Sequence, residues 1–216
     1  MLTQIDARTK ILFVCNPNNP TGTYWTHGAL EAFLERVGGR QIVVVDEAYC
    51  EFVEAGDFPD TLSLMARYPN LVVFRTFSKM YALAGLRIGY LMGDREVVDI
   101  IRRTCVVYSV NALAQVAAVA AADDDDHVRR TRDMVARGKV QVRSALEAMG
   151  LPVVCGEGNF MMIRLPMSDS LAYRKLMQQG VMVRTMTGFR FPNYIRLTIG
   201  EAPAMETFIT ALAAIL

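Results

Sequence analysis

The chain has 216 residues, of which 52% are hydrophobic and 21% charged, and its formal net charge is +1. These proportions exclude a disordered chain, and the nearly balanced charge gives no support for a nucleic-acid or membrane-surface partner. No apolar run approaches the ~20 residues that a membrane-spanning helix needs, so we expect a soluble, cytoplasmic protein. The four cysteines form no C-x-x-C pair and there are two histidines, so we expect neither a metal site nor a disulfide framework.

Three short apolar runs dominate the first half of the chain, at residues 11–15, 42–45 and 71–74. They are continuous and rich in Val, Ile and Phe, which is typical of parallel strands buried on both faces. A helical pattern that ends at Gly38-Gly39 separates the first two runs, and residues 60–67 suggest a short helix before the third. This alternation predicts an α/β, doubly wound region.

The pattern continues with a fourth strand at residues 88–92 and a helix from the N-cap Asp94 to Arg103. An alanine-rich helix follows near residues 112–122, and the run Asp123–Asp126 is expected to be a charged, solvated break. The remaining sequence predicts a smaller α+β domain, so the expected domains are residues 1–123 and 124–216. Its elements are a long helix at 128–149, a strand at 159–165, a helix at 168–179, strands at 181–184 and 194–199, and a helix from Pro203.

Polar clusters follow each of the three apolar strands. The first strand is followed by Asn-Pro-Asn-Asn-Pro-Thr-Gly (residues 16–22), the second by Asp-Glu-Ala-Tyr (46–49) and the third by Thr-Phe-Ser-Lys (76–79). Arg87 lies eight residues beyond Lys79. Ligands of open α/β sheets bind beyond the carboxyl ends of the strands, so we expect these side chains to converge on one pocket.

The residue types in these clusters suit one cofactor. Lys79 can attack a carbonyl if its pKa falls about three units from ~10.4, which costs roughly 4 kcal/mol and which burial near a cation would supply. A strand-end carboxylate such as Asp46 needs a cationic partner, and a protonated pyridine nitrogen is one. Hydroxyls of Thr76 and Ser78, with the fork of Arg87, would make a phosphate cradle. Together these groups match the needs of pyridoxal 5'-phosphate (PLP).

The three clusters, together with the segment Met-Tyr-Ala-Leu-Ala-Gly-Leu-Arg-Ile-Gly-Tyr after Lys79, resemble the class I/II aminotransferases of PLP-transferase fold type I. Within that family they look most like histidinol-phosphate aminotransferases. The resemblance covers nearly the whole chain, from about Ile11. It implies a partial large domain with a mainly parallel sheet, a C-terminal α+β small domain and a homodimer. It also implies transamination between histidinol phosphate and 2-oxoglutarate in histidine biosynthesis, giving imidazole acetol phosphate and glutamate.

Site roles follow from this resemblance. Lys79 would bond covalently to PLP and later move a proton between the substrate and the cofactor. Asp46 would pair with the pyridine nitrogen, and Tyr49 and Asn19 would hydrogen-bond the cofactor's phenolic oxygen. The cofactor phosphate would be held by Thr76, Ser78 and Arg87.

The second half of the chain contains two arginines in segments similar to substrate-binding segments of the family. Arg196 lies in a segment like the one that binds the substrate carboxylate, and Arg184 lies in a segment like the one that contributes a second arginine. In histidinol-phosphate aminotransferases the second arginine meets the substrate phosphate, and Arg196 would then serve the phosphate or the glutamate partner. Asn19 is also expected at the substrate.

Family members carry an N-terminal arm and an earlier stretch of the large domain, whereas ten residues precede the first predicted strand here. We therefore expect an N-terminally truncated chain, with unpaired sheet edges that favour association and with weakened cofactor binding. Two alternatives share almost every motif: an aromatic amino-acid aminotransferase and a threonine-phosphate decarboxylase-like PLP enzyme. A third alternative, of a different class, is an inactive remnant.

Overall fold

The computed structural model describes all 216 residues, and the chain divides into two compact units. Unit 1 contains Met1–Asn18 and Tyr24–Val128, and unit 2 contains Asn19–Thr23 and Arg129–Leu216. Neither unit is one continuous stretch, because the short segment Asn19–Thr23 leaves unit 1 to pack with unit 2.

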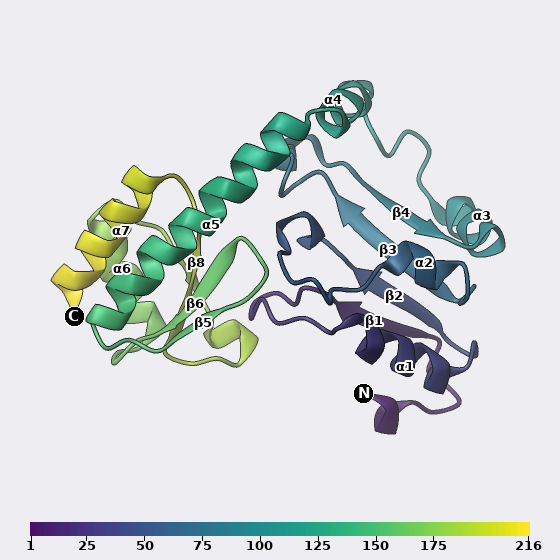
Figure 1. The fold of residues 1–216 in the computed structure, drawn as a ribbon, viewed down its shortest axis with the longest axis horizontal. Coiled ribbons are helices and arrows are strands. Elements are labelled where there is room, and N and C mark those ends of the chain that lie inside the picture. Colours follow the sequence, from purple (N-terminus) through teal and green to yellow (C-terminus); the bar gives the residue numbers. More distant parts are fainter. The chain divides into compact units, whose positions relative to one another are not determined.

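Unit 1 is built on a four-stranded sheet with the order β1-β2-β3-β4 (Figure 1). Strands β1 (Ile11–Cys15), β2 (Ile42–Asp46) and β3 (Leu71–Thr76) run parallel, and β4 (Gly89–Gly93) pairs antiparallel with β3. The mainly parallel sheet with intervening helices confirms the predicted α/β class. Because β2 and β3 are parallel neighbours, their carboxyl ends open at the same edge of the sheet.

Two helices cover one face of this sheet (Figure 1). Helix α1 (His27–Val37) begins where the Thr26 side chain accepts a hydrogen bond from the Ala29 amide, and it ends at Gly38 in the left-handed conformation. Helix α2 (Thr61–Met65) is capped by Asp60 in the same way. The core between helices and sheet consists of Leu12, Val14, Leu30, Phe33, Leu34, Val37, Val43, Val45, Leu64, Leu71 and Val73.

The prediction that all three strands are buried on both faces is wrong for β1. Its side chains alternate between buried and exposed, and Ile11 and Phe13 are 52% and 59% exposed. The reason is that β1 is an edge strand, and α1 covers only the face that carries Leu12 and Val14. Strand β2 does behave as predicted, with Val43–Val45 buried.

The remaining helices of unit 1 begin near their predicted positions. Helix α3 (Arg95–Thr104) has the predicted N-cap Asp94, which accepts a hydrogen bond from the Glu96 amide at 2.8 Å. Helix α4 (Ala112–Ala122) starts at the cap Asn111. Four single 3-10 turns complete the elements of the chain: η1 (Leu2–Gln4), η2 (Cys50–Phe52), η3 (Ala84–Leu86) and η4 (Thr187–Phe189).

The acidic run after α4 is shorter as a break than predicted. Helix α5 (Asp125–Ala148) already includes Asp125 and Asp126 in its first turn. Carboxylates are favoured there by the helix dipole, and the Asp124 side chain accepts a hydrogen bond from the His127 amide at 2.9 Å. Only Asp123 and Asp124 therefore separate the two helices.

Unit 2 contains an antiparallel sheet with the order β5-β6-β8-β7. The strands are β5 (Val153–Cys155), β6 (Phe160–Arg164), β7 (Arg184–Thr185) and β8 (Tyr194–Thr198), and the helices are most of α5, α6 (Asp169–Gln178) and α7 (Ala202–Ile215). Strand β5 was not predicted, because it is only three residues long and follows a proline. Strand β7 begins later than the predicted 181–184 because its pairing with β8 starts at Arg184.

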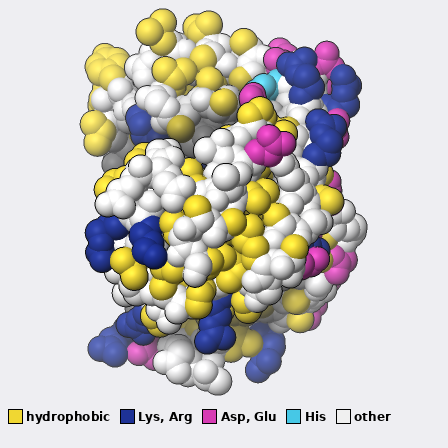
Figure 2. Space-filling model, turned by 90° about the vertical axis from the view of Figure 1, so that its left-hand side faces the viewer, with side chains coloured by type: hydrophobic (Ala, Val, Ile, Leu, Met, Phe, Trp, Pro, Cys, Tyr) yellow, Lys and Arg dark blue, Asp and Glu magenta, His cyan; other side chains and the backbone are white.

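The core of unit 2 is formed by the inner faces of the sheet and the three helices; its fully buried large side chains include Leu146, Phe160, Met161, Met162, Ile163, Leu176 and Phe208. Hydrophobic side chains also reach the surface on the face shown in Figure 2, where Lys and Arg side chains are scattered among them. Exposed apolar residues of unit 2 include Leu171, Met177 and Leu216. No helix combines the length and the apolar character needed to cross a bilayer.

Candidate functional site

One set of predicted site residues lies in unit 1, at or after the carboxyl ends of β2 and β3. Asp46 is the last residue of β2, in register with Phe74 of β3, and the Glu47 amide donates to the Phe74 carbonyl at 2.9 Å. The chain turns away from the sheet directly beyond these positions. The set consists of Asp46, Tyr49, Thr76, Ser78, Lys79 and Arg87.

Lys79 and Tyr49 are direct neighbours in this set. The Lys79 Nζ lies 5.5 Å from the centroid of the Tyr49 ring, within the range of a cation–π contact. Tyr49 is 5% exposed, whereas Lys79 is exposed. The Lys79 amine therefore lies beside a buried, fixed aromatic ring and remains accessible to a ligand.

Asp46 is half-buried, and its Oδ1 accepts a hydrogen bond from the Ala48 amide at 3.2 Å. This bond turns the chain after β2 and orients the carboxylate. Cys15 lies in register with Asp46 on the neighbouring strand, and burial, together with the Asp46 charge, raises the pKa of its thiol. The Asp46 carboxylate places a negative charge at the strand end, which favours a cationic partner.

The segment from Thr76 to Arg87 forms a compact turn. The Thr76 hydroxyl accepts from the Ser78 amide at 3.0 Å and donates to the Ile88 carbonyl at 3.5 Å. Arg87 has a φ of 56°, in the left-handed region, and its Nη1 donates to the Ala84 carbonyl at 2.8 Å. The turn thereby places two hydroxyls, an amine and an exposed guanidinium on one short stretch of chain.

Unit 2 holds the second set of predicted residues: Asn19, Arg184 and Arg196. The Arg196 Nη1 donates a hydrogen bond to Asn19 Oδ1, and the guanidinium lies 5.1 Å from the centroid of the Phe160 ring. The Nε of Arg196 is buried without a hydrogen-bond partner. An unsatisfied buried donor on a cation is costly, so this group favours an anionic ligand.

Arg184 and Arg196 lie side by side on adjacent strands of the sheet of unit 2. They are directly paired in the register of β7 and β8, so their side chains leave the same face. Like charges directly opposite each other destabilise a sheet unless an anion joins them. Arg184 is exposed, with its guanidinium 5.8 Å from the ring centroid of Phe189. The arrangement suits a ligand with a carboxylate or phosphate group.

A contact between two glycines holds Asn19 in unit 2, and the sequence did not reveal it. Gly22 has a φ of 71°, and a Cβ built on Gly156 would lie 2.2 Å from the Gly22 carbonyl oxygen. The Glu157 amide donates to that oxygen at 2.8 Å, and the Lys139 Nζ donates to the Gly156 carbonyl at 2.7 Å. Because the contact joins segments far apart in the chain, no local pattern could have signalled it.

A buried ion pair in unit 1 was also missed from the sequence, and it is formed by two residues that are each adjacent in sequence to a predicted site residue. Arg75 precedes Thr76 on β3, and its side chain bonds to Glu47, the residue after Asp46. The only sequence signal was a pair of opposite charges, each adjacent to a predicted site residue.

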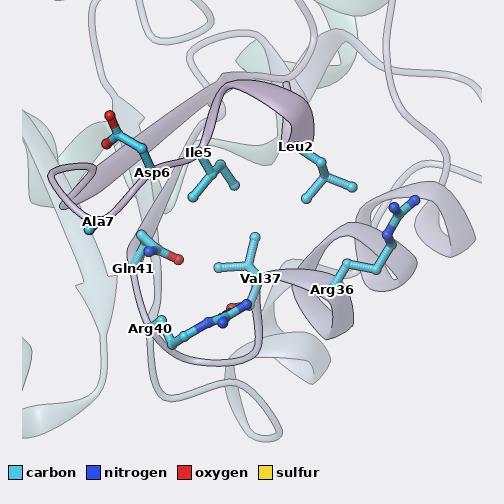
Figure 3. Close-up of a pocket in the computed structure, with 8 residues that line it drawn as sticks. All are labelled: Leu2, Ile5, Asp6, Ala7, Arg36, Val37, Arg40 and Gln41. Carbon is cyan, nitrogen blue, oxygen red and sulfur yellow. Dashed lines mark hydrogen bonds between the residues drawn. The ribbon is translucent and has the colours of Figure 1, made fainter.

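Unit 1 also has a pocket of about 460 Å³ between the N-terminal turn and the end of α1 (Figure 3). Figure 3 shows Ile5 and Val37 pointing into it and Asp6 pointing away. Asp6 accepts hydrogen bonds from the Arg8 and Thr9 amides, and these bonds, that from Arg8 foremost, lower its pKa. None of the predicted site residues lines this pocket, so it is separate from the candidate site.

Comparisons with known proteins show which sequences and structures this chain is similar to. The sequence profile of the family described as "Aminotransferase class I and II" matches residues 1–212. Among curated relatives, "Histidinol-phosphate aminotransferase 2" of Pseudomonas aeruginosa is 41% identical over 216 residues, covering 100% of this chain and 58% of the relative. "Histidinol-phosphate aminotransferase" of Moorella thermoacetica is 43% identical over 217 residues, covering 100% and 56%.

A solved structure described as a putative histidinol-phosphate aminotransferase, from Erwinia carotovora atroseptica, is similar with a TM-score of 0.89 at 25% identity. The match covers 96% of this chain and 60% of that one. The chain thus spans a little under three fifths of the length of these curated relatives. Since the family profile matches almost all of its residues, the chain belongs to the class I and II aminotransferase family.

Proposed function

We propose that this chain carries the cofactor- and substrate-binding residues of a PLP-dependent aminotransferase that acts on histidinol phosphate, with 2-oxoglutarate as acceptor. The observation that carries the proposal is the placement of the Lys79 amine beside the buried Tyr49 ring, in the unit where Asp46 ends the adjacent strand. When bound, PLP supplies an electron sink that stabilises negative charge at the substrate Cα.

The residues of unit 1 fit this group chemically. Lys79 is the amine that would hold the cofactor and then move a proton at the substrate Cα. Asp46 would accept a hydrogen bond from the pyridine nitrogen and keep it protonated, and Tyr49 would donate to the phenolic oxygen. The phosphate would be bound by Thr76, Ser78 and Arg87.

The residues of unit 2 would bind the substrates. The buried, unpartnered Nε of Arg196 and the paired cation Arg184 favour anionic groups, which histidinol phosphate and 2-oxoglutarate both have. Asn19 would orient Arg196 through their hydrogen bond. The names of the relatives support histidinol phosphate as the amino donor.

The proposal extends to the organisation of the protein. Residues 1–123 would form part of the PLP-binding large domain, and residues 124–216 the small domain. The working form would be a cytoplasmic homodimer in histidine biosynthesis.

Absorbance spectroscopy tests the proposal. The purified chain with added PLP should show a visible band from cofactor bonded to a lysine, and Lys79→Ala should abolish it. Lys10→Ala removes another exposed lysine of unit 1 and should leave the band unchanged. A band that survives in Lys79→Ala, or that is lost equally in Lys10→Ala, would contradict the assignment.

Substrate choice is tested by adding one amino donor at a time to the cofactor-loaded chain. Histidinol phosphate should consume the visible band, whereas phenylalanine and threonine phosphate should do so at least about tenfold more slowly. A faster reaction with phenylalanine or threonine phosphate would replace the proposed donor with that one.

A further inference from the structure

The buried ion pair Glu47–Arg75 joins the ends of two strands that carry the site. The Arg75 Nε donates a hydrogen bond to Glu47 Oε2 at 2.9 Å, and the Arg75 Nη2 lies 2.8 Å from the same oxygen in the ion pair. The Glu47 side chain is 0% exposed and the Arg75 side chain 26% exposed. A hydrogen bond and a second close contact from one planar guanidinium to one oxygen fix the direction as well as the distance.

The pair lies one residue from the site on each strand. Glu47 follows Asp46 directly, and Arg75 precedes Thr76 directly. Successive side chains of a strand point to opposite faces, so Thr76 faces away from Arg75. The pair therefore links β2 to β3 on the face of the sheet opposite to that of Thr76. It lies where both segments leave the sheet to form the site.

The surroundings hold Arg75 in its charged form. Burial alone would lower the pKa of Arg75, but the nearby Cys50 and Glu47 outweigh it and raise that pKa. Tyr90, which faces Arg75 in the register of β3 and β4, contributes a side-chain hydrogen bond. Burial raises the pKa of Glu47, and the Arg75 charge opposes that rise. The groups facing the pair are thus Cys50, Glu51, Thr61, Tyr81 and Tyr90.

Stability alone is a weak reason for such a pair. Removing two charges from water costs several kcal/mol per ion, and apolar replacements of similar volume are often neutral or stabilising. An apolar pair, however, has no directional bonds and would leave the two strand ends free to shift. A shift of 1 Å at a site is enough to disturb its chemistry.

We propose that Glu47 and Arg75 are positioning residues that hold Asp46 and the Thr76–Lys79 turn in the geometry that binds the cofactor. This inference rests on the proposed PLP function of unit 1. It assigns to the pair the alignment of two strand ends, while the residues that touch the cofactor remain those named above.

The test separates position from stability. Glu47→Leu should lower both the melting temperature and the PLP affinity, because it leaves Arg75 buried without its partner. The double variant Glu47→Leu/Arg75→Met should recover the melting temperature but still bind PLP about tenfold more weakly, with a shifted pH midpoint of the visible band. Full recovery of affinity and of the pH midpoint together with stability would overturn the proposal, because the pair would then be structural only.

A matched control removes a surface ion pair of the same unit. Arg67 and Glu31 form such a pair, with side chains 59% and 25% exposed. The variant Glu31→Leu/Arg67→Met should leave PLP affinity unchanged, and a comparable loss there would also overturn the proposal.

Arg75→Lys keeps the test decisive if the double variant does not fold. Lysine retains the charge but not the planar guanidinium that sets the direction of the contact, so we expect a nearly unchanged melting temperature with about three- to tenfold weaker PLP binding. Wild-type affinity in a folded Arg75→Lys variant would overturn the inference. If the unaltered chain forms no Lys79-dependent band, the proposed function itself fails, which is a different result from wild-type affinity in the variants.

Discussion

The guanidinium of Arg196 donates a hydrogen bond to the side-chain oxygen of Asn19, across 177 positions of the sequence. The two residues come from the segment after β1 and from β8, and both lie in unit 2. The same guanidinium lies over the Phe160 ring. Position and direction of this cation are therefore set by an amide on one side and an aromatic ring on the other.

Arg196→Lys should weaken the binding of 2-oxoglutarate by about 10- to 100-fold, because lysine keeps the charge but loses the fork and the stacking. Cofactor affinity should change less than about twofold, since the affected ligand is the substrate. Isothermal titration of the cofactor-loaded chain with 2-oxoglutarate, and of the cofactor-free chain with PLP, measures the two affinities. Arg164→Lys, at an exposed position on β6, is the control and should change neither. Equal losses in the two variants would remove Arg196 from the substrate site.

Tyr49→Phe keeps the ring beside Lys79 but removes the hydroxyl that would donate to the phenolic oxygen of the cofactor. Loss of a donor disfavours the deprotonated form of that oxygen, so the pH midpoint of the visible band should rise by about one unit. A spectrophotometric pH titration provides the measurement. Tyr68→Phe alters a tyrosine next to Arg67 instead and should leave the midpoint where it is. An unshifted midpoint in Tyr49→Phe would exclude the proposed hydrogen bond.

Asp169, the first residue of α6, should contribute stability to unit 2 that depends on pH. Burial would raise the pKa of its carboxyl, but hydrogen bonds from the Thr187 amide at 2.8 Å, the Thr187 hydroxyl at 2.7 Å and the Met186 amide at 2.9 Å lower it. A folded-state pKa below the unfolded value gives stability that is present above pH ~4 and is lost as the pH falls through the folded-state pKa.

Asp169→Asn should therefore lower the free energy of unfolding by about 2–3 kcal/mol at pH 7. It should also flatten the loss of stability below pH ~4, because the titrating group is gone. Urea unfolding at a series of pH values tests both effects. Asp99→Asn, whose side chain is 48% exposed, is the control. A steep acid loss that persists in Asp169→Asn would assign it to another carboxylate.

Gly156→Ala should destabilise unit 2 by about 1–3 kcal/mol, because the new Cβ would overlap the backbone of Gly22 and the backbone would have to shift. The shift would also move Asn19 away from Arg196, so 2-oxoglutarate should bind more weakly. Gly188→Ala provides a control in the same unit, since a Cβ there meets nothing within 4 Å. Chemical denaturation and ligand titration would report these changes, and identical behaviour of the two variants would argue against the glycine contact.

Phe13→Lys should reduce self-association of the chain. Phe13 and Ile11 form an exposed apolar strip on the edge strand β1, and such strips favour pairing with other chains. A lysine there should keep the free energy of unfolding within about 0.5 kcal/mol. Sedimentation equilibrium compares the association constants, with Leu62→Lys on the opposite, helical side as control. Association that is insensitive to Phe13→Lys would place the contact elsewhere.

Local patterns predicted much of the fold. The apolar runs marked β1, β2 and β3 because buried strands need continuous hydrophobic sequence, and Asp94 marked the start of α3 because caps are local. Patterns could not tell that the outer face of β1 is uncovered, since a residue's burial depends on what packs on it. They also underestimated how readily Asp125 and Asp126 enter a helix.

The site was predicted to the extent that its residues cluster in sequence. The strand-end rule placed Asp46 and Lys79 in one unit, because parallel strands present their carboxyl ends together. Their roles toward PLP remain predictions. The links between distant segments, such as Gly22 with Gly156 and Glu47 with Arg75, depend on three-dimensional packing and leave no periodic trace.

The interleaving of the two units has a consequence for dissecting this protein. The pentapeptide Asn19–Thr23 is encoded between β1 and α1 yet packs with residues that follow Val128. A polypeptide that begins at Arg129 would lack the Asn19 side chain that accepts the hydrogen bond from Arg196. A polypeptide that ends at Val128 would contain the segment Asn19–Thr23 without the unit 2 residues on which it packs. If the chain is cut after Val128, the two halves should therefore recover the hydrogen bond between Asn19 and Arg196 only when they are mixed.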